Sequence, residues 1–182
     1  MKTLVRNGRI ASDGRVESAD LLLADAVVAA VGHDLGPAER EIDASGCWVL
    51  PGLVDLHVHV ADRIGRFELA DDYESGTRVA VKNGITTLAA FVTQGPAESL
   101  GEALRRARAR AAGRCHADVT WHLTPTRFEA ADWAEMESLV RAGYRTFKLY
   151  TTSRGAGLFS DAVRLDELFT RLGPLGVRFL LH

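Results

Sequence analysis

Residues 51–60 read PGLVDLHVHV, and the pattern of apolar and polar residues along the chain changes at this stretch. Leucine and valine dominate residues 53–60, a pattern typical of a β-strand. Because side chains alternate along a strand, His57 and His59 must lie on the same face, two positions apart. A neutral imidazole is the commonest metal-binding side chain, so the pair predicts a shared cation. Two inward histidines that bind no metal are the alternative interpretation.

After this strand, apolar runs alternate with helix-like stretches of ten or more residues, which indicates a βαβ array. Glycines at Asn83-Gly84 and Ala142-Gly143 fit the ends of two helices. A complete (β/α)8 barrel takes about 250 residues, so residues 51–182 suffice for roughly half of the ring. The fold class expected is α/β, a partial TIM (β/α)8 barrel. Its expected strands are 53–60, 85–92, 118–124, 146–151 and 177–182, and its expected helices are 71–83, 97–112, 130–142 and 164–172.

Residues 1–50 have a different organisation. Short apolar runs alternate with turn signals such as Asn7-Gly8 and Ser12-Asp13-Gly14, which suggests small antiparallel strands joined by tight turns. We therefore expect a small β domain at 1–50 and a truncated half-barrel at 51–182. The last residues, Leu180-Leu181-His182, are strand-like, so the chain is expected to stop within the barrel and to leave unpaired strand edges.

The bulk composition is that of a globular protein, with 182 residues, 47% hydrophobic and 25% charged. The formal net charge is −2 and the arginines between 105 and 110 fit a solvated helix face, so no nucleic-acid partner is expected. Only Cys47 and Cys115 are present, which fits a reducing compartment, the cytoplasm by default. No apolar run has the length of a membrane span, so no membrane partner is expected.

Two longer motifs carry a resemblance to a known family. PGLVDLHVH, followed by DDYESGTRVAVKNGITTL, resembles the opening of the dihydropyrimidinase, hydantoinase, allantoinase and dihydroorotase branch of the amidohydrolase superfamily. Residues 1–50 resemble the N-terminal part of that family's small β-sandwich domain, and IDASGCWVLPG resembles its passage into the barrel. The resemblance implies hydrolysis of a C–N bond in a small cyclic amide or ureide. The agent implied is a hydroxide that bridges two metals in the full-length protein.

The resemblance also implies a ligand set. Lys148, in TFKLY, stands at the position of a lysine that reacts with carbon dioxide and bridges two metals, and a depressed pKa would give it the neutral amine required. His182, at the end of FLLH, stands where the family has a metal-binding histidine. One metal would be held by His57, His59 and Lys148, the other by Lys148 and His182. Imidazoles favour zinc, although manganese, iron or cobalt also suit such a site.

Other polar residues have open roles. Asp55 could orient a metal ligand or make an ordinary buried hydrogen bond. His122 could line the site or be a satisfied core histidine. The remaining family ligands, a histidine and the aspartate that shuttles protons, would lie beyond residue 182, so no catalytic residue is expected within the chain. Without the resemblance, Lys148 would be a snorkelling or chance interior lysine.

Two departures from the family keep three hypotheses open. Dihydroorotases usually have an arginine where Ala61 stands, although Arg63 or Arg66 could substitute for it. Hydantoinases usually have an oxyanion-stabilising tyrosine where Ser153 stands, and Tyr150 is not given that role. The leading hypothesis is a hydantoinase or dihydropyrimidinase type of hydrolase, expected to be a homo-oligomer at full length. The alternatives are a dihydroorotase and a non-catalytic scaffold.

Overall fold

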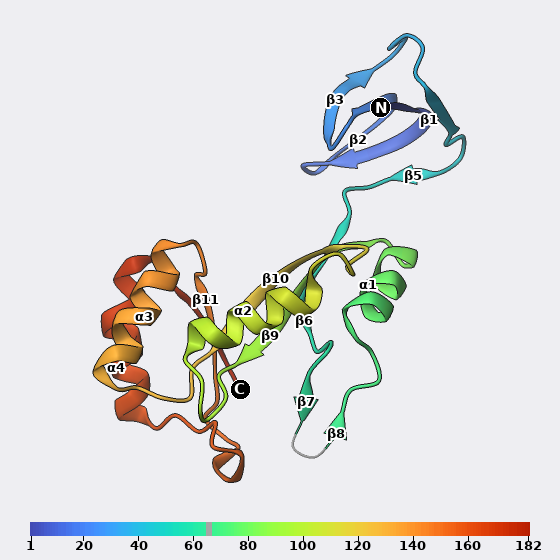
Figure 1. The fold of residues 1–182 in the computed structure, drawn as a ribbon. Helices are drawn as coiled ribbons and strands as arrows, with labels where there is room; N and C mark the ends of the chain where they lie inside the picture. The colour runs from blue at the N-terminus through green and yellow to red at the C-terminus, as the bar shows by residue number, and fades with distance from the viewer. Residues whose placement is uncertain (65–66) are drawn as a thin grey trace. The chain divides into compact units, whose positions relative to one another are not determined.

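A computed structural model describes residues 1–64 and 67–182 of the chain. It consists of two compact units, Met1–Gly52 and Leu53–His182 (Figure 1). None of the helices described is long and apolar enough to cross a membrane. Both cysteines are free thiols.

The first unit is a five-stranded sheet with the order β3-β2-β1-β4, in which β5 also pairs with β1. The first three strands are antiparallel, as the turn signals predict. The expectation of antiparallel strands is wrong for β4 and β5, because both pair parallel with β1. Residues 33–39, which form neither helix nor strand, replace a tight turn before β4, and turn signals do not reveal the pairing direction across such a loop. The strands are β1 Lys2–Ser12, β2 Arg15–Ala24, β3 Val27–Gly32, β4 Arg40–Asp43 and β5 Trp48–Val49.

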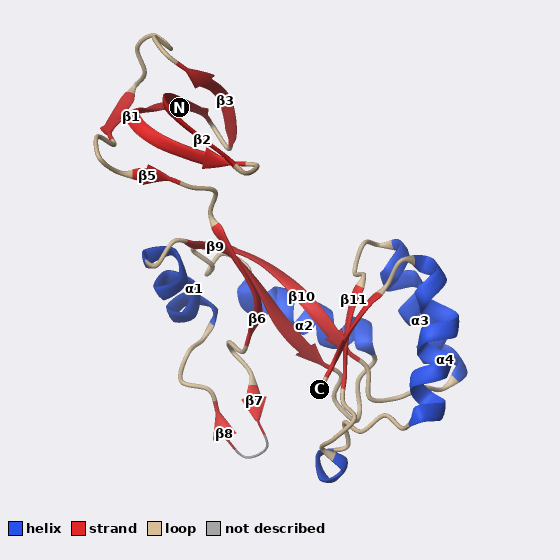
Figure 2. Cartoon of the chain, turned by 180° about the vertical axis from the view of Figure 1, so that it is seen from behind, coloured by secondary structure: helices blue, strands red, loops and turns tan. Residues whose placement is uncertain are grey.

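The second unit confirms the predicted partial (β/α)8 barrel. Its five strands are parallel and neighbour one another in chain order, β12-β11-β10-β9-β6, with one α-helix in each connection. Helices α3 and α4 lie side by side beyond β11 (Figures 1 and 2). The strands are β6 Leu53–Val58, β9 Ile85–Thr93, β10 Asp118–Thr124, β11 Thr146–Leu149 and β12 Arg178–Leu181. The helices are α1 Tyr73–Lys82, α2 Leu100–Ala111, α3 Ala130–Arg141 and α4 Ala162–Leu172.

Polar caps explain where these helices begin. The Asp72 carboxylate accepts the Ser75 backbone N–H at 2.8 Å, and Asp161 accepts the backbone N–H of Arg164 at 2.9 Å. The second cap starts α4 two residues before its predicted position, because it satisfies N–H groups of the first turn that have no partner within the helix. After α1, Gly84 has a φ of 83°, the left-handed conformation that ends a helix at little cost.

The hydrophobic core lies between the parallel sheet and its helices. Leu123, Phe147 and Leu149 are fully buried there with residues of α2, α3 and α4. Because side chains alternate along a strand, His122, Thr124 and Lys148 lie on the opposite face of the sheet, here called the inner face. The core thus decides which polar side chains share the inner face.

The connection between β6 and α1 holds an element that the sequence pattern does not predict. Two short strands, β7 Arg63–Ile64 and β8 Phe67–Glu68, pair antiparallel as a hairpin. Each is two residues long, too short for an alternating pattern to reveal it. Two 3₁₀ turns, η1 Arg154–Ala156 and η2 Gly173–Leu175, flank α4.

Candidate metal centre

The two histidines at the carboxyl end of β6 lie together. The ring centroids of His57 and His59 are 5.6 Å apart, and both rings contact the ring of Phe91, at 4.7 and 4.6 Å between centroids. Asp55 accepts the backbone N–H of His57 at 3.0 Å, so this hydrogen bond holds the main chain and not an imidazole ring. The structure therefore brings the two imidazoles, one within β6 and one just after its end, to one aromatic neighbour.

Lys148 reaches the same aromatic ring from β11. Its side chain is only 3% exposed, and its Nζ lies 5.9 Å from the centroid of Phe91 and 5.1 Å from that of Tyr150. Within the part of the chain that is described, Lys148 makes no hydrogen bond or ion pair through its side chain. Burial lowers the pKa of Lys148, which favours the neutral amine. Lys148 thus lies near the imidazoles without an anionic partner.

His182 follows β12 and is linked to Lys148 through Tyr150. The rings of Tyr150 and His182 are stacked, with centroids 5.3 Å apart. The backbone N–H of His182 donates to the Leu149 carbonyl at 3.0 Å, and its own carbonyl accepts the Thr151 hydroxyl at 2.6 Å. His57, His59 and Lys148 therefore share Phe91, whereas Lys148 and His182 share Tyr150.

Histidine and carboxylate side chains alone do not form a cage here. Among residues 1–64 and 67–182, no group of three or more His, Cys, Asp or Glu side chains is placed to hold a metal ion. Within the described residues, a metal centre at this place would need Lys148 as a further ligand, and an ammonium group cannot bind a metal.

Electrostatics favour the neutral form of the His57 imidazole. Loss of water around the ring lowers the pKa of His57, and the positive charge of Lys148 lowers it further, while Asp55 acts in the opposite direction. A neutral imidazole has a nitrogen lone pair for a cation. In His59, the Nδ1 atom faces Asp62 Oδ2 at 3.4 Å, and a carboxylate in this place orients the ring so that Nε2 can face a metal.

His122 differs from the other histidines of the inner face. It is 4% exposed, and both ring nitrogens have partners: the Thr146 hydroxyl at 2.8 Å and the Leu56 carbonyl at 2.9 Å. No nitrogen is left for a metal. The structure therefore favours the interpretation of His122 as a satisfied core histidine that ties β10 to β6 and β11.

A cleft of about 940 Å³ opens beside Phe91, at the carboxyl ends of the strands. It is bounded by the connections that follow β6, β9, β10 and β11, which is where (β/α)8 barrels bind substrates. Phe91 lines the cleft and also contacts the rings of His57 and His59, so the cleft lies next to the imidazoles. The four predicted metal ligands are not themselves among the residues that line it.

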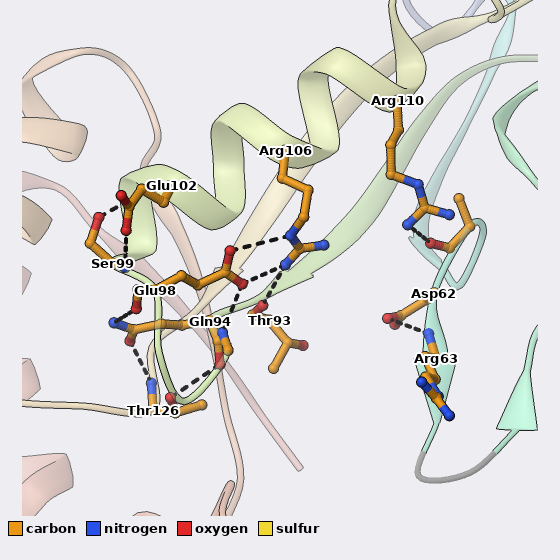
Figure 3. A network of polar contacts seen from close by, with 12 residues as sticks. Asp62, Arg63, Thr93, Gln94, Glu98, Ser99, Glu102, Arg106, Arg110 and Thr126 are labelled. Carbon is orange, nitrogen blue, oxygen red and sulfur yellow. Dashed lines mark hydrogen bonds and ion pairs between the residues drawn. The ribbon is translucent and has the colours of Figure 1, made fainter.

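A hydrogen-bonded network fixes the rim of the cleft (Figure 3). Gln94 is 2% exposed, and its Oε1 accepts the backbone N–H groups of Thr126 and Arg127 at 3.0 and 3.3 Å. Its Nε2 donates to the Glu98 carbonyl at 3.2 Å. The Glu98 carboxylate in turn accepts hydrogen bonds from Arg106 at 2.6 and 3.2 Å. Gln94 therefore joins the connections after β9 and β10.

The arginines of α2 are more than a solvated helix face. They are exposed, as predicted, but Arg106 also pairs with Glu98, and Arg110 donates to the Ala61 carbonyl at 2.7 Å. Arg108 donates to the Tyr144 hydroxyl at 3.2 Å. The bonds of Arg106 and Arg110 anchor connections around the cleft, whereas that of Arg108 ties α2 to the segment before β11; the charge pattern alone did not reveal them.

The residues that depart from the family pattern lie at strained or exposed places. Ala61 and Ser153 have φ values of 52° and 63°, in the left-handed region. Arg63 lines the cleft, and its guanidinium has no partner among the described residues. Arg66, the other candidate for a dihydroorotase-like arginine, lies outside the described residues.

The inner face suits the metals that the resemblance implies. Two imidazoles lie side by side, and a buried lysine has no anion next to it. In addition, Thr124 Oγ1 is buried without a hydrogen-bond partner among the described residues. Buried polar groups normally have partners, so these unsatisfied groups fit a site that a metal-bound carboxylated lysine would complete.

Comparison with known proteins identifies this arrangement as that of a barrel hydrolase family. The sequence profile of the Amidohydrolase family matches residues 48–153, more than half of the chain, and the chain belongs to this family. D-hydantoinase from Ralstonia pickettii is 32% identical over 168 residues, which cover 92% of this chain and 37% of the relative. D-hydantoinase from Streptomyces coelicolor (strain ATCC BAA-471 / A3(2) / M145) is 33% identical over 187 residues, covering 100% and 40%.

The similarity extends to solved structures. The crystal structure of dihydropyrimidinase from Brevibacillus agri NCHU1002 matches with a TM-score of 0.94 and 29% identity, covering 100% of this chain and 40% of that chain. The chain thus spans 37 to 40% of the length of these relatives. These matches confirm the predicted cyclic-amidohydrolase branch.

Proposed function

We propose that this chain contributes part of a metal-dependent active site that hydrolyses the C–N bond of a cyclic amide or ureide, as in hydantoinases and dihydropyrimidinases. The observation that carries the proposal is the convergence of His57, His59 and Lys148 on the ring of Phe91. The likeness to D-hydantoinases supports the same substrate class. Neither the dihydroorotase nor the scaffold hypothesis has an observation that favours it over this one.

The residues have separate roles in this proposal. His57, His59 and Lys148 would hold one divalent cation, and Lys148 with His182 would contribute to the second. Such cations, when bound, polarise an amide carbonyl and lower the pKa of water, and zinc suits the imidazoles. Asp62 orients His59, because its carboxylate faces Nδ1.

Lys148 acts in this proposal as a carboxylated side chain. Its burial favours the neutral amine that can react with carbon dioxide, and the product is a bidentate anion suited to two cations. The cleft beside Phe91 would admit the ring of the substrate. The aspartate that shuttles protons is expected outside residues 1–182. A cytoplasmic location and a homo-oligomer remain predictions.

The proposal is tested on the protein as it is expressed from its gene. The metal content is measured after growth with zinc, and opening of hydantoin, dihydrouracil and dihydroorotate is followed separately. We expect about two metals per chain and hydrolysis of hydantoin or dihydrouracil. A folded protein without metal or turnover would support the scaffold hypothesis instead, and turnover of dihydroorotate alone would support the dihydroorotase hypothesis.

A further inference from the structure

Thr124, the last residue of β10, has a buried hydroxyl that lacks a partner. Its side chain is 1% exposed, and Thr124 Oγ1 is one of two buried side-chain atoms without a hydrogen bond among the described residues. The other is Glu135 Oε2, whose carboxylate is already engaged through Oε1 by the Ser99 hydroxyl at 2.7 Å. A native fold seldom leaves a buried hydroxyl entirely unpaired, so Thr124 needs an explanation.

The sheet places this hydroxyl beside the candidate metal centre. Leu123 is fully buried under the helices and is paired with Phe147 of β11. The next residues along the two parallel strands are Thr124 and Lys148, and alternation puts both on the inner face. From this register we infer that the Thr124 and Lys148 side chains lie next to each other on the inner face.

Thr124 and Lys148 do not form a hydrogen bond with each other through their side chains. Lys148 makes no hydrogen bond or ion pair in the described part of the chain, and Thr124 Oγ1 makes no hydrogen bond there. A carboxylated lysine would change this, because its carbamate has two anionic oxygens and no longer carries the positive charge. A hydroxyl that donates to an anionic oxygen forms one of the stronger hydrogen bonds in proteins.

We propose that Thr124 is a positioning residue whose hydroxyl donates a hydrogen bond to a carbamate oxygen of carboxylated Lys148 and thereby stabilises the modification. The inference rests on the proposed function, in which Lys148 is carboxylated. In the reaction, the neutral amine attacks the carbon of carbon dioxide and forms an N–C bond. One C–O π pair moves to oxygen, and an amine proton passes to solvent. Thr124 makes or breaks no covalent bond, and its hydrogen bond opposes the reverse reaction.

The experiment measures the carbamate directly. The expressed protein is equilibrated with ¹³C-labelled bicarbonate, and the carbamate carbon of Lys148 is quantified by ¹³C NMR in the wild type and in Thr124→Val, Thr124→Ser and Thr93→Val variants. Thr93 pairs with Thr124 from the neighbouring strand β9 and so serves as the matched control. Lys148→Met identifies the signal.

We expect the equilibrium constant for carboxylation to fall about tenfold or more in Thr124→Val, because a hydrogen bond to a charged group is lost. Thr124→Ser should restore the signal, since serine keeps the hydroxyl, and Thr93→Val should leave it unchanged. If Thr124→Val fails to fold by circular dichroism, a Thr124→Ser signal equal to that of the wild type supports the proposal. A tenfold loss in Thr124→Ser overturns it.

The failures of the two proposals are distinguishable. A clear carbamate signal of equal size in the wild type and in Thr124→Val, with a raised melting temperature in the variant, would mean that the hydroxyl stays unpaired and would overturn this inference alone. No carbamate in a wild-type protein that binds no metal would overturn the proposed function and this inference together.

Discussion

Two groups of polar side chains occupy the carboxyl ends of the barrel strands, and they differ in how fully they are hydrogen-bonded. In the open cluster, His57, His59, Thr124 and Lys148, every side chain has at least one polar atom without a partner in the described chain. In the closed network, each side chain is hydrogen-bonded to another member or to the backbone of a neighbouring connection. Its members are Gln94, Glu98, Arg106, Arg127 and Asp132.

The difference separates polar groups that hold the fold from those available for chemistry. Buried polar groups are costly unless they are paired, so a closed network stabilises the connections that it joins. An open cluster costs stability in the free chain and gains partners only from a ligand or modification. His122 shows the same contrast within one residue type, because both of its ring nitrogens are occupied.

The largest effect is expected at Lys148. Lys148→Met keeps much of the buried volume but removes the ligand shared by both metals, so metal content should fall to one or none per chain. Turnover should fall by at least about a thousandfold, since metals supply several kcal/mol of transition-state stabilisation. The free energy of unfolding of the metal-free protein should stay equal or rise, because a buried amine is removed. Metal analysis, steady-state kinetics and urea unfolding measure the three quantities, and a stoichiometry like that of the wild type would exclude Lys148 as a ligand.

The histidines offer the sharpest matched pair. His59→Asn should weaken zinc binding by more than about a hundredfold, because a direct ligand is lost. Loss of a residue that only hydrogen-bonds to a ligand already lowers metal affinity by about 10- to 100-fold. His122→Asn is the matched control, because both ring nitrogens of His122 already have hydrogen-bond partners. It should lower the free energy of unfolding by about 1–3 kcal/mol, because a buried partner is left unsatisfied, with little change in zinc affinity. Competition with a chelator and chemical unfolding give both values, and the reverse order of zinc affinities would refute the distinction.

A smaller effect is expected in the closed network. Gln94→Leu removes the acceptor of the Thr126 and Arg127 backbone N–H groups and should lower the free energy of unfolding by about 2 kcal/mol. Zinc stoichiometry should not change, because Gln94 is not among the proposed ligands. Gln94→Glu, which retains the acceptor, is the control. If Gln94→Leu were as stable as the wild type, the network would not stabilise these connections.

The smallest effect concerns pH. A hydrogen bond from Arg127 at 2.8 Å holds the pKa of the buried Asp132 carboxyl below its usual 3.8. The carboxylate thus contributes stability above pH 3.8, and the contribution is lost as the pH falls through the lower folded-state pKa. Asp132→Asn should flatten this acidic part of the unfolding profile, measured by circular dichroism between pH 2 and 5. If Asp132→Asn kept the same slope of stability against pH as the wild type, the acidic pH dependence would not come from Asp132.

Much of the fold could be predicted from local patterns. Strand β10 was predicted with its exact bounds, because apolar and polar residues alternate over its length. The hairpin β7–β8 was not predicted, since two-residue strands have no periodicity, and the parallel pairing of β4 was missed because it depends on a distant strand.

The candidate site could be predicted as far as the alternation of side chains along a strand shows which residues share a face. Alternation placed His57 and His59 on one face, and the resemblance singled out Lys148 and His182. Phe91 and Tyr150, which connect these residues, look like ordinary core aromatics in the sequence. Thr124 could have been suspected, because it follows His122 by two residues, but only the structure shows that its hydroxyl is unpaired.

The most direct test of the open cluster is a crystal structure of the expressed protein grown with zinc and bicarbonate, with anomalous diffraction recorded at the zinc edge. We predict two zinc peaks on the inner face. One should be bonded to His57, His59 and Lys148, the other to Lys148 and His182, with carbamate density on Lys148. Zinc bound elsewhere, or an unmodified Lys148 between two empty positions, would contradict it.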